Sequence, residues 1–208
     1  MPVRSICSGH DMSAPPQPGI YVSGGLSSAV VGEGRRALFL DRDGVINVNH
    51  GYVHTADQTE WVPGIFKFCA AARDAGYALV VVTNQAGIAR GYYSEADFLD
   101  YTGWVHKAFA AHGAEILATF YCPHHPTAGL GEFRVECGCR KPAPGMFTAA
   151  AHLLGLVLGE SIMLGDKDSD LIAAANAGIH QRFLIDSSKL GAFDAPAEYM
   201  SRCGQEHG

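Results

Sequence analysis

The chain has 208 residues, which is enough for one domain with a well-filled core. Hydrophobic residues make up 48% and charged residues 17%, and no run approaches the ~20 apolar residues that cross a bilayer, which argues against a membrane-spanning protein. A formal net charge of -6 gives no general attraction to nucleic acid or anionic lipid, so any phosphate group must be recognised by locally placed basic side chains.

Residues 1–36 are expected to be a flexible N-terminal extension. They are rich in Gly, Ser, Pro and Ala and show neither helical nor strand periodicity. Gly, Ser and Pro also interrupt every apolar stretch that could form a secretory signal, so we expect a cytoplasmic protein.

From residue 37, short apolar runs alternate with helix-like segments, which is typical of a parallel sheet covered by helices. Ser94 caps one of these helices, and Asp97 three residues later completes a motif close to a capping box. We therefore predict one three-layer, Rossmann-like α/β domain over residues 37–190, followed by a C-terminal tail over 191–208. The predicted strands lie at 37–40, 78–82, 116–121, 161–164 and 182–185, the predicted helices at 63–75, 94–111, 144–154 and 168–177, and a long irregular loop at 122–139.

Two carboxylates, Asp41 and Asp43, follow the first predicted strand. Ligands bind at the carboxyl ends of the strands in such sheets, so both side chains can face one site. A calcium-binding EF-hand loop is a competing interpretation, but its glycine and glutamate positions hold Ile46 and Tyr52. A solvated turn is the other alternative.

The second predicted strand ends in a hydroxyl and an amide, those of Thr83 and Asn84, and each can donate a hydrogen bond to a phosphoryl oxygen. Taken alone, Thr83 is better explained by a structural role. Arg140 and Lys141 follow the irregular loop and supply a planar fork and a point charge, both suited to phosphate, although such cations are usually only solvated.

Carboxylates also follow the fourth predicted strand. Asp166 is the one best placed to meet Asp41 across a hard cation. Asp168 and Asp170 can simply charge and cap the next helix.

The irregular loop carries Cys122, His124, Cys137 and Cys139, which together form a full tetrahedral ligand set. Structural zinc favours such sites with three cysteines and one histidine, and a closed ligand shell would hold the loop in place. Reduced buried cysteines or a disulfide are the alternatives. The adjacent His125 is interpreted as facing solvent.

These four strand-end segments, in this order, resemble the motif set of the haloacid dehalogenase (HAD) superfamily, and within it the family of heptose bisphosphate phosphatases. The segments are Asp41 to Asn47, Thr83 to Gly91, Arg140 to Pro142 and Gly165 to Lys167. The resemblance covers about residues 37–179. It implies a phosphatase that removes the 7-phosphate of D-glycero-D-manno-heptose 1,7-bisphosphate during nucleotide-activated heptose biosynthesis.

The resemblance also assigns roles to residues. Asp41 would attack phosphorus to form an aspartyl phosphate, and Asp43 would act as general acid and then general base. A magnesium ion would be held by the carboxylates of Asp41 and Asp166 and the backbone carbonyl of Asp43. Thr83 and Lys141 would stabilise the transferring phosphoryl group.

Too few residues separate the motifs for a large cap domain, so the site is expected to be open. Substrate recognition would then fall to surrounding loops, with the zinc loop shaping the substrate side; His50 and Tyr52 can equally be packing or solvated residues. The expected substrate-binding residues are Asn49, His50, Gly51, Tyr52, Asn84, Arg140 and Lys167.

Two other functions are considered. A histidinol-phosphate phosphatase would share the catalytic set and a similar zinc loop, but the spacing from His124 to Cys137 and the segment 49–52 favour the heptose substrate. A catalytically silent, zinc-stabilised binding protein is disfavoured by the complete set of acid, cation and hydroxyl groups. We expect a monomer that acts on a small sugar phosphate and binds neither nucleic acid nor membrane.

Overall fold

The structure is a computed structural model that describes residues 16–23 and 34–187. It contains the five predicted strands and four predicted helices, with ends that agree to within about two residues. The strands are β1 (Gly19–Tyr21), β2 (Ala37–Leu40), β3 (Ala78–Asn84), β4 (Ile116–Cys122), β5 (Ile162–Gly165) and β6 (Gln181–Leu184). The α-helices are α1 (Ile65–Asp74), α2 (Ala86–Ala89), α3 (Glu95–Ala111), α4 (Gly145–Leu154) and α5 (Asp168–Asn176), with short 3-10 turns η1 (Ala56–Gln58), η2 (Gly131–Phe133) and η3 (Leu158–Glu160).

The strands form one six-stranded sheet in the order β1-β4-β3-β2-β5-β6. Strands β2 to β6 are parallel, and β2 lies between β3 and β5. The chain therefore leaves β2 in one direction along the sheet and later returns to its other side. Such a reversal of strand order is where α/β sheets open a ligand crevice.

Strand β1 was not predicted. It lies within residues 1–36, which were expected to be a flexible extension, and it pairs antiparallel with β4 at the edge of the otherwise parallel sheet. Three residues are too few to show a periodicity, and the strand forms because the free edge of β4 supplies backbone partners. The rest of the predicted extension beyond residues 16–23 and 34–36, and the predicted tail over 191–208, lie outside the described residues.

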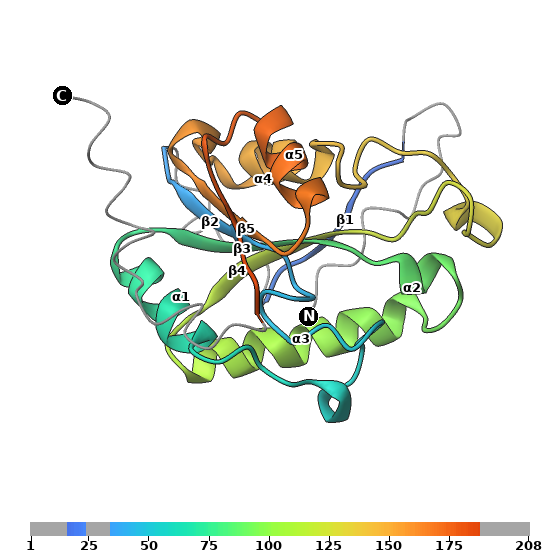
Figure 1. The fold of residues 1–208 in the computed structure, drawn as a ribbon, viewed down its shortest axis with the longest axis horizontal. Coiled ribbons are helices and arrows are strands. Elements are labelled where there is room, and N and C mark those ends of the chain that lie inside the picture. Colours follow the sequence, from blue (N-terminus) through green and yellow to red (C-terminus); the bar gives the residue numbers. More distant parts are fainter. Residues whose placement is uncertain (1–15, 24–33, 188–208) are drawn as a thin grey trace.

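Helices cover both faces of the sheet, as Figure 1 shows: α1 and α3 lie on one face, and α4 and α5 on the other. Alternate residues of β2 point to opposite faces, so Leu38 and Leu40 enter the core beneath α1 and α3, whereas Phe39 enters the core beneath α4. All four residues of β2 are fully buried, which explains its continuous apolar run.

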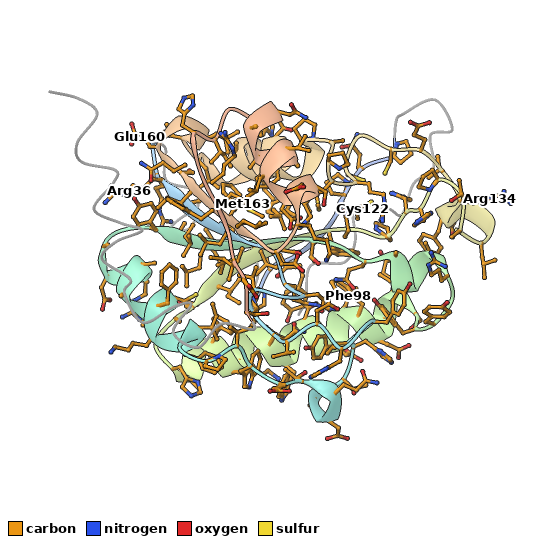
Figure 2. The ribbon with its side chains drawn as sticks, viewed as in Figure 1. Arg36, Phe98, Cys122, Arg134, Glu160 and Met163 are labelled. Atoms are coloured by element: carbon orange, nitrogen blue, oxygen red, sulfur yellow. The ribbon has the colours of Figure 1, made fainter. Side chains whose placement is uncertain are left out.

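Helix α3 begins at the predicted capping box, in which the side chain of Ser94 accepts from Asp97 N and the side chain of Asp97 accepts from Ser94 N. The helix then runs along the sheet and directs Phe98 toward it (Figure 2). No helix in the described part of the chain is long and apolar enough to span a membrane. Between residues 34 and 187 the connections between the main helices and strands contain only the short elements η1, α2, η2 and η3, which leaves no room for a large cap domain in this range.

Candidate active site

The carboxyl ends of β2, β3 and β5 bring Asp41, Thr83 and Asp166 to one edge of the sheet. Asp41 follows β2 directly, and its backbone N–H donates to the carbonyl of Leu164 in β5 (2.9 Å). Leu40 pairs with Val81, which sets Thr83 about one residue beyond Asp41 along the neighbouring strand. Asp41 and Thr83 are buried, and so is the lysine that lies between the strand ends.

That lysine is Lys141, whose ammonium group contacts three segments of the site. Its Nζ atom lies 2.9 Å from Asp41 Oδ1 and 2.7 Å from Asp170 Oδ1, and it donates to the carbonyl of Val82 in β3 (2.9 Å). All three donors of the ammonium are thereby used. Burial alone would lower the pKa of Lys141, but the two carboxylates raise the pKa above its ordinary value, so the group stays charged.

Asp41, Asp166 and Asp170 offer carboxylate oxygens that all lie within 4.8 Å of one another. Both Asp170 oxygens accept hydrogen bonds within the fold, one from the buried Lys141 and the other from the backbone N–H of Lys167. Both Asp166 oxygens lie near Lys167 Nζ (3.2 and 3.1 Å), but that ammonium is exposed and can be displaced, so Asp41 and Asp166 are the better ligands for a cation. Burial and the neighbouring negative charge of Asp41 raise the pKa of Asp166 to about 6. Carboxylates that repel one another in this way suit a hard divalent cation with oxygen ligands.

Gly44 allows this close approach of chain segments. Its φ of 92° is in the left-handed region, and a Cβ at this position would lie 2.4 Å from an oxygen of Asp166. Only glycine meets both conditions without strain. The glycine of the D-x-D-G sequence is therefore required by the turn that brings this segment against Asp166.

Asp43 lies outside the carboxylate cluster and is held by its neighbours. Arg42 Nη2 donates to both of its oxygens (3.0 and 2.8 Å), and Asn47 Nδ2 donates to Oδ1 (3.1 Å). The buried Arg42 also donates to the carbonyl of Val53 (2.6 Å), so the same guanidinium holds the segment that follows residues 49–52. These bonds hold the Asp43 side chain in place, two residues after Asp41. The side chain remains 18% exposed, and a general acid must be accessible in this way to reach a leaving group.

Asn84, a predicted substrate contact, instead uses both ends of its carboxamide on the backbone of Lys141. Its Nδ2 donates to Lys141 O (3.0 Å), and its Oδ1 accepts from Lys141 N (3.0 Å). The structure therefore places Asn84 as a support for Lys141. The predicted contact between Asn84 and substrate stays a prediction.

Four of the other predicted substrate residues, 49–52, lie in an exposed loop that leads to Val53, whose carbonyl accepts from Arg42. His50 Nε2 is 2.9 Å from the exposed Glu60 carboxylate, Asn49 Oδ1 accepts from Gly51 N (3.1 Å), and Tyr52 has a φ of 55° and packs edge-on against Tyr92 (4.7 Å between centroids). All four residues are exposed and therefore accessible to a ligand, and these contacts lie within their own loop or beside it.

The two remaining predicted cations differ in their surroundings. Arg140 Nη1 donates to the carbonyl of His124 (3.1 Å), which links Arg140 to the cysteine-rich loop. Among the residues that the structure describes, its other guanidinium donors have no hydrogen-bond partner. Lys167 Nζ lies 3.1 Å from Asp166 Oδ2 and is 55% exposed.

The cysteine-rich loop brings its four predicted ligands together. The three sulfur atoms of Cys122, Cys137 and Cys139 lie 3.3 to 3.5 Å apart, and His124 Nδ1 lies 3.7 Å from Cys122 Sγ and 3.5 Å from Cys139 Sγ. Ligands of tetrahedral zinc, with bonds of ~2.3 Å to sulfur and ~2.0 Å to nitrogen, lie roughly 3.5 to 3.8 Å apart. The separations fit zinc and exceed the ~2.05 Å of a disulfide bond.

The surroundings of this cluster also fit a metal. The mutual hydrogen bonds of the three thiols lower the pKa of Cys137 and raise the pKa of Cys122 and Cys139, so the cluster keeps protons on two sulfurs that a bound cation would displace. Figure 2 shows Cys122 where β4 enters the loop, so the cluster joins the sheet to the loop that carries Arg140. His125 is only partly buried, and its Nδ1 accepts from Ala128 N (3.0 Å), consistent with its exclusion from the ligand set.

Two features of the site were not predicted. Asp170 caps α5 as expected, but it is 1% exposed and also pairs with Lys141; its spacing of four residues from Asp166 was the available signal. Gln85 and Tyr93 form a buried hydrogen-bonded pair beside Thr83, with Tyr93 Oη donating to Gln85 Oε1 (2.7 Å). No sequence motif predicted the hydrogen bond between Gln85 and Tyr93.

Comparisons with known proteins agree with this geometry. Residues 138–189 match the HAD-hydrolase-like family model. The chain is 48% identical over 153 residues to a D-glycero-beta-D-manno-heptose-1,7-bisphosphate 7-phosphatase of Vibrio cholerae, covering 74% of this chain and 82% of that protein. It is 50% identical over 150 residues to the corresponding alpha-heptose enzyme of Burkholderia mallei, covering 72% and 79%.

A solved structure adds a view of the ligands. The crystal structure of D,D-heptose 1,7-bisphosphate phosphatase from B. bronchiseptica, complexed with magnesium and phosphate, has a TM-score of 0.64 and 35% sequence identity to this chain. The similarity covers 72% of this chain and 80% of that one.

Proposed function

The chain belongs to the D-glycero-D-manno-heptose-1,7-bisphosphate 7-phosphatase family of HAD-like hydrolases, and on this basis we propose that it removes the 7-phosphate of that sugar bisphosphate with Asp41 as the nucleophile. It is a phosphoric monoester hydrolase. The observation that carries the mechanism is the buried position of Lys141 between Asp41 and Asp170, at the strand ends where Asp166 and Thr83 also lie.

Asp41 attacks phosphorus through the carboxylate oxygen not engaged by Lys141, and the leaving sugar oxygen departs with a proton from Asp43. The ammonium of Lys141 orients Asp41 and offsets the negative charge of the transferring phosphoryl group. The Asp43 carboxylate, held by Arg42 and Asn47, then removes a proton from the water that hydrolyses the aspartyl phosphate. The slow hydrolysis of a phosphate monoester is thereby divided into two easier steps.

Magnesium would be held by the carboxylates of Asp41 and Asp166 together with the backbone carbonyl of Asp43. When bound, it supplies a positive charge that screens the repulsion between the nucleophile and the phosphate. The raised pKa of Asp166 and the closeness of three carboxylates support a cation at this position.

Zinc would be held by Cys122, His124, Cys137 and Cys139, and its role would be structural because four protein ligands leave no open position for substrate. The ion would fix the loop on which Arg140 is mounted. Activity would then depend on magnesium, and zinc alone would not restore it.

Arg140 is the proposed contact for the 1-phosphate. It lies beside the catalytic lysine in sequence and is anchored by one donor to His124 O, with further donors free for a bidentate contact. Histidinol phosphate offers no second phosphate. Losing a charge-assisted contact costs about 1.5 to 3 kcal/mol, which is roughly tenfold to a hundredfold in discrimination.

The test is to measure kcat/KM with magnesium for both anomers of the heptose bisphosphate and for histidinol phosphate. We expect kcat/KM for the better heptose anomer to exceed kcat/KM for histidinol phosphate by at least about tenfold. Arg140→Ala should reduce this ratio. If the wild type had comparable kcat/KM values for the heptose bisphosphates and histidinol phosphate, the heptose assignment would be wrong, although the protein would still be a phosphatase. Phosphate release from none of the three would favour a catalytically silent binding protein.

A cytoplasmic, monomeric enzyme is also proposed. The thiols of Cys69, Cys122, Cys137 and Cys139 are all free, which suits a reducing compartment. Sedimentation of the purified protein at several concentrations tests the monomer.

A further inference from the structure

Thr83 can donate only one proton, so its usefulness to a phosphoryl group depends on where that proton points. The side chain is 1% exposed, and Thr83 Oγ1 accepts a hydrogen bond from Gln85 Nε2 (2.8 Å). Because an amide nitrogen is purely a donor, this bond occupies a lone pair of the hydroxyl and leaves its proton unused. The proton is then available for a ligand at the strand ends.

The direction of that bond depends on how the Gln85 carboxamide is turned. A carboxamide rotated by half a turn would present its oxygen and draw the Thr83 proton away from the site. Tyr93 opposes this rotation, because its hydroxyl donates to Gln85 Oε1 at 2.7 Å. Burial raises the pKa of Tyr93 to about 12, so the hydroxyl keeps its proton, and the neighbouring Arg42 guanidinium can only donate toward the tyrosine oxygen.

Two neighbours pack closely against the ring of Tyr93. One is Gly87, where a Cβ atom would lie 2.2 Å from the ring. The other is the imidazole of His54, which is stacked at 4.5 Å between centroids and an angle of 18°. His54 Nδ1 is also 2.8 Å from the carbonyl of Tyr52, which connects the ring to the predicted substrate loop.

We propose that Gln85 and Tyr93 are positioning residues that orient the Thr83 hydroxyl, so that its proton points at the phosphoryl group. The three side chains form one buried chain in which each oxygen accepts from one side and each proton is directed toward the site. This role rests on the proposed contact of Thr83 with phosphate. It is independent of which sugar the enzyme uses.

The experiment is a double-mutant cycle in zinc-loaded protein with magnesium. Tyr93→Phe and Gln85→Met each remove one link while keeping most of the side-chain volume. We expect each to lower kcat for p-nitrophenyl phosphate about fivefold to tenfold with little change in KM, as loss of one oriented neutral hydrogen bond implies. Thr83→Val should lower kcat about a hundredfold, as removal of a donor to a developing charge does.

The decisive comparison is made in the Thr83→Val background, where no hydroxyl remains to be oriented. There, Tyr93→Phe and Gln85→Met should change neither kcat nor the Kd for orthovanadate measured by calorimetry. Tyr101→Phe is the matched control, since Tyr101 is 5% exposed, against 6% for Tyr93, and its hydroxyl bonds only to Thr59 Oγ1 (2.8 Å) among the described residues. It should retain wild-type kcat.

Equal losses from Tyr93→Phe in both backgrounds would assign the residue to packing and overturn the proposal, as would wild-type kcat in both single variants. Neither readout uses a heptose, so a failed substrate assignment leaves the result intact. Orthovanadate binding provides the comparison for any variant whose turnover is too slow to measure.

Discussion

Replacing Lys141 by Met should destabilise the fold as well as abolish turnover. The ammonium is 1% exposed and lies 2.9 and 2.7 Å from the carboxylates of Asp41 and Asp170, which are 7% and 2% exposed. Without it, two buried carboxylates face each other without a cation. Breaking a buried ion pair by removing one partner typically costs about 3 to 5 kcal/mol.

For a domain of this size, 1 kcal/mol corresponds to about 2 to 4 °C in Tm, so Lys141→Met should unfold roughly 10 °C below wild type in magnesium-free buffer. Adding Asp170→Asn should recover part of the loss, because the second buried charge is then gone. Circular dichroism on heating measures all three proteins.

Lys167→Met is the matched control. Lys167 also pairs with a site carboxylate, Asp166, at 3.1 Å, but it is 55% exposed, and exposed pairs contribute about 0 to 1 kcal/mol. Its Tm should stay within a few degrees of wild type. A Tm for Lys141→Met equal to that of Lys167→Met would refute the reasoning, since it would mean that the carboxylates are not charged when the lysine is absent.

Three further predictions follow from the site and the core. Asp41→Asn should leave Tm within a few degrees of wild type and release no phosphate from any substrate, and near-normal turnover would remove Asp41 as nucleophile. Cys137→Ser should lower the zinc content, measured by mass spectrometry, from one ion per chain and lower the Tm, whereas protein purified without chelator that contains no zinc would contradict the site. His106 is buried between Ser23 Oγ (2.9 Å) and Thr119 Oγ1 (2.8 Å), and burial lowers its pKa to about 4. Since the unfolded imidazole binds its proton near pH 6.5, stability due to neutral His106 is present above that pH and is lost as the pH falls toward 4, by about 2 to 3 kcal/mol at pH 4.5. Urea unfolding of wild type and His106→Gln at pH 7 and 4.5 should show a smaller loss in the variant, and equal losses would show that the buried imidazole does not resist protonation.

The sequence was informative where one residue type meets a strong local requirement. The apolar run 37–40 is buried on both faces, and Ser94 with Asp97 forms the predicted cap. The four candidate zinc ligands could be chosen because sulfur and imidazole at such spacing have few other uses in a loop. These signals do not depend on knowing which distant segments will meet.

Two of the features missed by sequence analysis depend on contacts between distant segments: strand β1 exists because β4 has a free edge, and Asp170 pairs with a distant lysine. The four-residue helix α2 was missed for another reason, since it is too short to show a period. Asp170 was interpreted as a helix cap because that role is local, while its pairing with Lys141 joins residues far apart in the chain. A local role that accounts for a residue does not exclude a second one.

Gln85 and Tyr93 show the same point for chemistry. Thr83 is recognised by its place after a strand, but the orientation of its proton is decided by a tyrosine ten residues later, whose ring fits only because residue 87 is glycine. Each of these residues alone has an ordinary structural explanation. The hydrogen-bonded series Tyr93–Gln85–Thr83 is recognised only when donors and acceptors are assigned one bond at a time. The Tyr93 hydroxyl keeps its proton and donates it to Gln85, and Gln85 then donates to Thr83, so the single Thr83 proton has one consistent direction. A site that handles phosphate is therefore specified by the groups that fix its hydrogen-bond donors as well as by the donors themselves.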